Sequence, residues 1–245
     1  MINDVYKTVQ SVANKDNNGY LTPDEFNRYA KAAQLELFEQ MFHDYSRASA
    51  KRNRRGHKDG YGDVPKRLSE AIQIFTTEDT LVFDGVQQAF FIPQKTYWVK
   101  DVFYDSTTPV EICTPREAAE QRVLLDAAPT TSYPIGVLYE NTNFTLPSYE
   151  GIKQIFRVYP SSIQSNVVVN RIRYPEDPKW TYQTFANGEP IFDQSQADYQ
   201  DFELPLDDYE NLVIKILSYL GIQIDKYVLN QFAQYKEQNE KQLEQ

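Results

Sequence analysis

The 245-residue sequence is poor in the residues that build disulfides, metal sites and nucleophilic centres, with one cysteine and two histidines. A single cysteine, Cys113, excludes an internal disulfide and a cysteine-rich zinc site. A thiol nucleophile needs a neighbouring base, and the two histidines, His43 and His57, fall in a predicted helix and in a basic loop. We therefore interpret Cys113 as a small buried apolar residue.

Long apolar runs and catalytic motifs are missing as well. No stretch approaches the roughly 20 apolar residues that span a bilayer, and Met1 to Gln10 lacks the basic-then-apolar order of a secretory signal. The sequence has no glycine-rich phosphate loop, no Gly-x-Ser-x-Gly elbow, no His-Glu-x-x-His motif and no dinucleotide fingerprint. These absences predict a protein of the cytosol without a membrane partner, catalytic residues or a cofactor.

The composition is that of a globular protein, 41% hydrophobic and 14% aromatic, but its charge is unevenly distributed. The net charge of −10 disfavours nucleic-acid binding by the whole surface. Residues 47–58, which we call the basic segment, hold six basic residues and no acid, so the other residues carry −16, the net −10 less +6. The six are Arg47, Lys51, Arg52, Arg54, Arg55 and Lys58.

A second stretch, residues 193–210, which we call the acidic strip, contains seven acids: Asp193, Asp198, Asp201, Glu203, Asp207, Asp208 and Glu210. We expect the basic segment to extend until a negative partner meets it. That partner is the acidic strip of an adjacent subunit, the phosphates of DNA, or solvent alone. The first choice makes the two stretches an inter-subunit interface.

Helical periodicity dominates the start of the chain. Ile2 to Ala13 repeats apolar residues at the three-to-four spacing of an amphipathic helix. A second helix is predicted from Pro23 to about Ser46, because Thr22 is an N-cap and Glu25 its capping-box partner. Together they predict a helical hairpin. Residues 46–62 are polar and aperiodic and predict a flexible arm, followed by a short helix at 65–75.

The centre of the chain changes to strand signals. Three β-rich runs between Thr80 and Tyr104 predict an antiparallel meander. Further strands are expected at 136–139, 155–159, 165–174 and 201–204, with a helix at 116–126 behind a Thr114 cap. The helical period returns at Asp207, stops at Gly221, and returns again from about 225 to 242.

These elements predict an α+β fold with an N-terminal helical hairpin, a central antiparallel β region and C-terminal helices. The expected segments are a hairpin at 1–48, a basic flexible arm at 49–63, a mainly β domain at 64–206 and helices at 207–245.

One motif suggests a metal, because residues 14–25 match an EF-hand calcium loop at most positions. The ligand oxygens would come from Asn14, Asp16, Asn18, Tyr20, Thr22 and Glu25. However, Asn14 stands where the motif has an aspartate, and no second loop is present. An Asn-Gly turn followed by a capping box uses the same residue types without a metal, and Glu25 then bonds to Thr22. We expect no metal here.

Three segments resemble the structural ring proteins of crAss-like and related podovirus-type bacteriophages. They are NKDNNGYLTPDEFNRYAKAAQLELFEQMF, YEGIKQIFRVYPSSIQSNVVVNRIRYPEDPKW and DFELPLDDYENLVIKILSYLGIQI. The resemblance implies a ring below the portal, in the neck through which the genome passes. Such rings commonly follow the portal's symmetry, which implies about twelve copies. The family's turn at 14–25 varies at the ligand positions, which argues further against calcium.

The resemblance therefore implies a non-enzymatic virion protein of the head-to-tail connector, made in the cytoplasm of a host bacterium. Its partners would be further copies of itself, the portal protein, other neck and tail ring proteins, and DNA passing without sequence-specific binding. Eighteen tyrosines and 14 phenylalanines suit a protein rich in contacts. Two alternatives stay open: a calcium-binding EF-hand-like module, and a tail-associated protein acting on carbohydrate or cell wall through acids such as Asp207 and Asp208.

Overall fold

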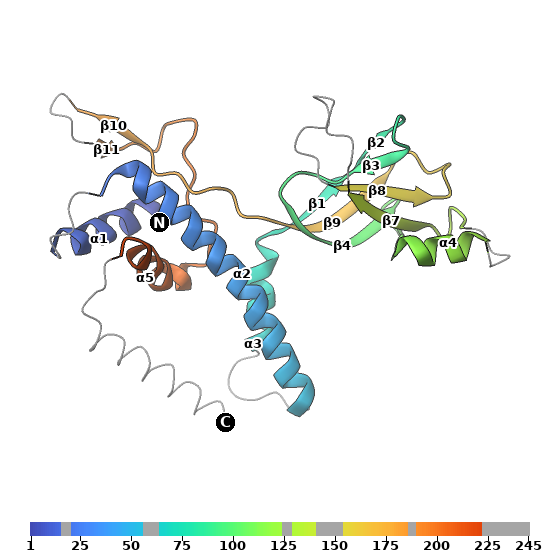
Figure 1. The fold of residues 1–245 in the computed structure, drawn as a ribbon, viewed down its shortest axis with the longest axis horizontal. Coiled ribbons are helices and arrows are strands. Elements are labelled where there is room, and N and C mark those ends of the chain that lie inside the picture. The colour runs from blue at the N-terminus through green and yellow to red at the C-terminus, as the bar shows by residue number, and fades with distance from the viewer. Residues whose placement is uncertain (16–20, 56–63, 124–128, 141–153, 186–189, 222–245) are drawn as a thin grey trace. The chain divides into compact units, whose positions relative to one another are not determined.

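The computed structural model describes residues 1–15, 21–55, 64–123, 129–140, 154–185 and 190–221. The fold is α+β, as the sequence predicts. The chain divides into two compact units, Met1–Ile74 with Pro175–Gln245, and Phe75–Tyr174, which we call the helical unit and the sheet unit (Figure 1). The β-rich residues expected within one segment at 64–206 are thus shared between the two units.

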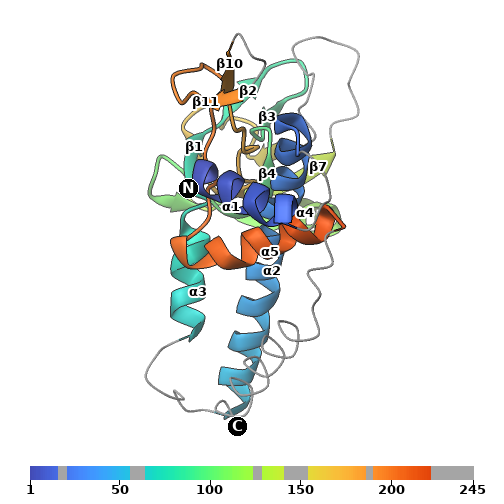
Figure 2. The ribbon, with the colours of Figure 1, turned by 90° about the vertical axis from the view of Figure 1, so that its left-hand side faces the viewer.

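The helical unit is built around helix α5. Its helices are α1 (Ile2–Lys15), α2 (Pro23–Arg55), α3 (Val64–Gln73) and α5 (Tyr209–Tyr219), the last preceded by the 3₁₀ turn η2 (Leu206–Asp208). The two N-terminal helices form as predicted, and Tyr6 of α1 contacts Phe26 of α2 with ring centroids 5.0 Å apart. Both helices also contact α5 (Figure 2). Helix α5 supplies an apolar face, with Leu212, Val213, Ile216 and Leu217 all buried. The helix ends as predicted, before Gly221 at φ +68°.

Polar side chains on one face of α2 hold the irregular segment that precedes η2. Asn27 brackets Trp180, donating to its carbonyl (3.2 Å) and accepting from its N–H (2.8 Å). Gln34, only 1% exposed, donates to the carbonyl of Glu176 (2.7 Å) and accepts from the N–H of Glu203 (3.0 Å). Asn27 and Gln34 share a face because seven residues are about two helical turns.

The strand expected at residues 201–204 does not form, and the same bonds explain why. The N–H of Phe202 donates to the side chain of Asp201, and that of Glu203 donates to Gln34. Apolar and acidic residues alternate from Asp201 to Leu204, as they do in a strand. Here Phe202 and Leu204 are both buried without a strand being formed.

An aromatic stack joins α1 to a short hairpin in the same unit. Trp180 is 2% exposed and stacks on Tyr6 of α1, with ring centroids 4.1 Å apart. The hairpin consists of β10 (Tyr182–Thr184) and β11 (Pro190–Phe192), and its cross-strand pair Tyr182 and Phe192 stacks on Trp180. One face of the hairpin is therefore covered by its own chain.

The sheet unit contains two sheets, ordered β1-β9-β4-β5 and β2-β3-β8-β7-β6. The strands of the first are β1 (Thr76–Thr80), β9 (Val167–Arg173), β4 (Thr96–Tyr104) and β5 (Thr108–Pro109). Those of the second are β2 (Val82–Asp84), β3 (Ala89–Phe91), β8 (Gln154–Tyr159), β7 (Ile135–Glu140) and β6 (Glu111–Cys113). All the pairs are antiparallel except β6 with β7, which helix α4 (Pro115–Val123) connects.

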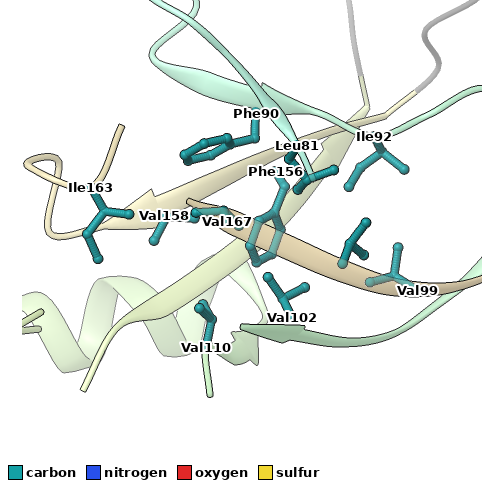
Figure 3. Packing of buried hydrophobic residues seen from close by; sticks show 11 residues of the cluster. Leu81, Phe90, Ile92, Val99, Val102, Val110, Phe156, Val158, Ile163 and Val167 are labelled. Atoms are coloured by element: carbon teal, nitrogen blue, oxygen red, sulfur yellow. The ribbon is translucent and has the colours of Figure 1, made fainter. Parts of the chain in front are cut away.

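The two sheets share one core (Figure 3). Phe90 and Phe156 come from one sheet, Val99 and Val102 from the other, and all four are buried in the same cluster. The predicted meander is therefore wrong: β2 and β3 pair, but β4 pairs with β9 in the opposite sheet. The apolar residues of β3 and β4 can face each other across the core only when the strands lie in different sheets.

Candidate interaction surfaces

The basic segment lies largely in a helix, which corrects the expectation of a flexible arm. Helix α2 continues through Arg55 and includes Arg47, Lys51, Arg52 and Arg54, whereas Lys58 lies outside the described residues. The extension follows from composition, because residues 47–55 contain alanine, lysine and arginine, all good helix formers, and neither glycine nor proline.

Helical geometry gathers most of these positions on one side of α2. Each residue advances about 100° around the axis, so positions 47, 51, 54 and 55 fall within a sector of about 100°, with position 52 outside it. Basic residues at a helix C-terminus also interact favourably with the helix dipole. Four of the six basic positions, 47, 51, 54 and 55, thus lie along one side of α2.

Three acids of the acidic strip form ion pairs within the helical unit. Asp201 Oδ2 accepts from the amino group of Met1 (3.0 Å), and its Oδ1 accepts from the N–H of Ile2 (2.7 Å), so this carboxylate caps the start of α1. Asp198 pairs with Lys179, and Asp207 pairs with Arg67 of α3. The hydrogen bond from Lys179 lowers the pKa of Asp198.

Two further acids accept hydrogen bonds from nearby residues. Asp193 Oδ1 accepts from Ser195 Oγ (2.6 Å) and from its N–H (2.9 Å), and these bonds lower the pKa of Asp193. Glu203 accepts from the N–H of Glu176 (2.9 Å). Five carboxylates of the strip are therefore engaged within the chain, and a neighbour's basic segment would compete with those bonds.

The remaining acids of the strip, Asp208 and Glu210, stand at the start of α5. Asp208 accepts from the side chain of Asn211 (3.3 Å), and Glu210 is exposed in the first turn. Neither forms an ion pair with another described residue. Leu206, directly before them, is 81% exposed.

The calcium motif coincides with a formed capping box. Thr22 Oγ1 and the Thr22 N–H donate to Glu25 Oε2 (2.7 and 3.1 Å), and the Glu25 N–H donates to Thr22 Oγ1 (3.3 Å). These bonds lower the pKa of Glu25. Asn14 is in the last turn of α1, while Asp16, Asn18 and Tyr20 lie outside the described residues. The carboxylate that would close a calcium cage is thus bonded to Thr22, in the arrangement that needs no metal.

Cys113 is buried at the end of β6, among Ala118 of α4 and Ile135 and Val137 of β7. Burial, followed by the charges of Glu111 and Glu117, raises the pKa of the thiol. This environment disfavours the thiolate that a nucleophile needs. Of the histidines, His43 is exposed beside Asp44, and His57 lies outside the described part of the chain.

The described residues contain neither a candidate metal-binding cluster nor a helix that could span a membrane. Within them, no group of three or more histidine, cysteine, aspartate or glutamate side chains is placed to hold a metal ion. Among the same residues, no helix combines the length and the apolar character that crossing a bilayer requires.

An arginine–tyrosine surface on the sheet unit was not predicted. On the face of the second sheet that carries α4, Arg122 of α4 lies over the ring of Tyr159 (4.2 Å from Cζ to the centroid), and Arg157 of β8 lies over Tyr139 (5.2 Å). The sequence signal was a basic residue at the end of a predicted helix and another inside a predicted strand. Neither signal shows that α4 folds back over β7 and β8.

Exposed apolar side chains on the β10–β11 hairpin were also missed. Gln183 pairs with Ile191, and Phe185 lies two residues beyond Gln183, so Phe185 and Ile191 belong to one face. Their exposed fractions are 61% and 49%. Because the other face rests on Trp180, the hairpin is apolar on both sides. A scan for periodicity cannot separate such a hairpin from a fully buried strand pair.

No protein-family model matches this chain, and no curated protein sequence matches it.

Proposed function

We propose that this chain is a non-enzymatic structural subunit of a tailed bacteriophage, forming a ring of about twelve copies below the portal in the head-to-tail connector. Its location is the virion, after synthesis in the host cytoplasm. Its partners are further copies, the portal protein, other neck and tail ring proteins, and the genome in transit. The proposal starts from the resemblance of three segments that span most of the chain.

The observation that carries the proposal is the amount of apolar side chain exposed on ordered elements of both units. In the sheet unit the most exposed are Val82, Val86, Trp98, Val123 and Tyr133. In the helical unit they are Ile74, Phe185, Ile191, Leu206 and Ile214. Scattered exposure is ordinary, but aromatic and aliphatic residues clustered on a hairpin are typical of contact surfaces. Burial of such residues between subunits would stabilise an assembly by about 25 cal/mol per Å².

Within the same proposal, the basic segment would line the channel through which the genome passes. Five acids of the acidic strip are bonded within the chain, so the strip is a weaker partner for the segment than the sequence suggested. Phosphates of the passing DNA, bound through charge alone, suit a helical basic face.

The test is to image the full-length protein by electron microscopy and weigh it by native mass spectrometry, alone and with the portal protein of the same phage. We expect a closed ring that stacks on the portal, and antibody labelling of intact particles at the neck. A protein that remains monomeric with the portal and is absent from purified particles would refute the proposal.

A further inference from the structure

Arg122 and Arg157 are supported by aromatic rings but lack a carboxylate among the residues that the structure describes. Neither belongs to an ion pair with a described residue. By contrast Arg116, six residues before Arg122 on α4, pairs with Glu120 (2.9 Å). A guanidinium lying flat on a ring keeps its N–H groups at the edge free for an acceptor in its plane.

Arg157 shows the need for an acceptor most directly. Its Nη2 donates to the carbonyl of Gln87 (3.3 Å), but its Nε is buried and has no hydrogen-bond partner among the residues that the structure describes. A buried charged donor without an acceptor destabilises the fold. An incoming carboxylate would not reach the buried Nε itself, but it would compensate the charge of the guanidinium through a charge-assisted bond to its other N–H groups.

An apolar side chain accompanies the two arginines. Ile135 of β7 pairs with Tyr159, and Tyr133 lies two residues before Ile135, which places it at the Tyr159 end of the sheet. Tyr133 is 81% exposed. The surface therefore offers one apolar and two cationic groups, and its complement is an exposed apolar residue beside carboxylates.

The start of α5 presents that complement. Leu206 is exposed, and Glu210, a strip acid without an ion pair to a described residue, lies four residues later and therefore on the same side of the helix. Asp208 is two residues from each of them, on another side, and accepts from Asn211. We infer that Glu210 of one copy binds Arg122 and Arg157 of the next, with Leu206 against Tyr133. This inference rests on the proposed ring, where each subunit offers two different surfaces to its two neighbours. It assigns the acid of the ring contact to the start of α5 and its partners to α4 and β8.

A charge swap tests the contact. Arg122→Glu and Glu210→Arg should each weaken self-association of the full chain by about tenfold or more, as expected when one member of a desolvated pair is lost. The double variant should recover most of the loss, because the swapped charges meet again between copies. Matched controls are Arg116→Glu, on the same helix, and Glu39→Arg, an exposed acid of α2, which should self-associate as the wild type does. Sedimentation velocity at low and raised salt gives the readout.

Three results would overturn the inference. One is unchanged self-association of both single variants; since Arg122 is exposed, its replacement tests the contact without threatening the fold. Another is a loss of thermal stability in the monomer with unaltered assembly, which would mean that the arginines stabilise the fold of their own subunit and make no contact with a neighbour. The third is binding of a DNA duplex that Arg122→Glu abolishes while assembly is unaffected. If the wild type fails to self-associate at all, the proposed ring fails instead.

Discussion

At the residue scale, the partners of a side chain decide which surfaces are available for function. Asp201 belongs to a run of acids that predicts a contact surface, yet its carboxylate caps α1 from 199 residues away along the chain. Nothing local to Asp201 reveals a partner at that separation. The same holds for Asp207 and Arg67, which are 140 residues apart.

The packing around Gly136 gives a prediction about the stability of the sheet unit. A Cβ at this position would lie 2.0 Å from Cζ of Phe156, which is fully buried in the shared core. Gly136→Ala should therefore destabilise the sheet unit by about 1 to 3 kcal/mol or more through overpacking. Urea unfolding followed by tryptophan fluorescence and circular dichroism measures the loss.

Gly85→Ala is the matched control, because an added Cβ there meets nothing within 4 Å. Its unfolding midpoint should stay near that of the wild type. Equal midpoints for both variants would show that the Phe156 ring does not occupy the space beside Gly136.

At the scale of elements, local sequence signals predicted where helices begin better than they predicted which strands pair. Thr22 forms the expected capping box with Glu25, and Thr114 is the expected cap of α4, because these bonds join residues three apart. The return bonds from Thr114 to Glu117 were not predicted. The far end of α2 was predicted nine residues too early, at Ser46 instead of Arg55, since the residues beyond Ser46 have no apolar periodicity although their helix propensity is high. Sheet membership could not be predicted, because β1 pairs with β9 across the 86 residues 81–166.

The capping box of α2 yields a prediction with a pH dependence. Thr22→Ala should cost about 1 kcal/mol near neutral pH. The pKa of Glu25 is lowered in the fold by its bonds from Thr22, so their contribution is present above the unfolded pKa and is lost as pH falls through the lowered value. The stabilities of wild type and variant should thus converge in acid. As a control, Thr107→Ala changes a residue of an exposed turn, and its free energy of unfolding should follow that of the wild type at every pH.

Gln34 provides a second prediction about an element. Gln34→Ala removes the partners of the Glu176 carbonyl and the Glu203 N–H together. A loss of about 2 kcal/mol is expected for the removal of two part-buried hydrogen bonds, with faster hydrogen exchange at the Glu203 amide. Lys31→Ala removes only an exposed ion pair with Asp177 and should cost less than about 1 kcal/mol. Unchanged exchange at Glu203 in Gln34→Ala would contradict the role of Gln34.

At the scale of the whole molecule, the sheet unit is one continuous stretch of sequence, inserted between the two sequence segments that form the helical unit. Its two ends are neighbours, because the Arg173 N–H donates to the Phe75 carbonyl (3.0 Å) and Thr76 pairs with Ile172. Residues 75–174 expressed alone should therefore fold and unfold cooperatively. Circular dichroism melting and amide dispersion in NMR spectra check this, and a broad melt without dispersion would show that the sheet unit depends on the rest of the chain.

The adjacency of these ends has a consequence for the order of folding. Helix α5 must find α1 and α2 across a stretch of 100 residues, and closing a flexible loop of that length costs about 4 kcal/mol in chain entropy. Once β1 and β9 have paired, the two ends of the folded sheet unit lie close together, so the loop that remains to be closed is short. Assembly of α1, α2 and α5 then closes only a short loop, so we expect the middle of the chain to fold first and to bring the two ends together.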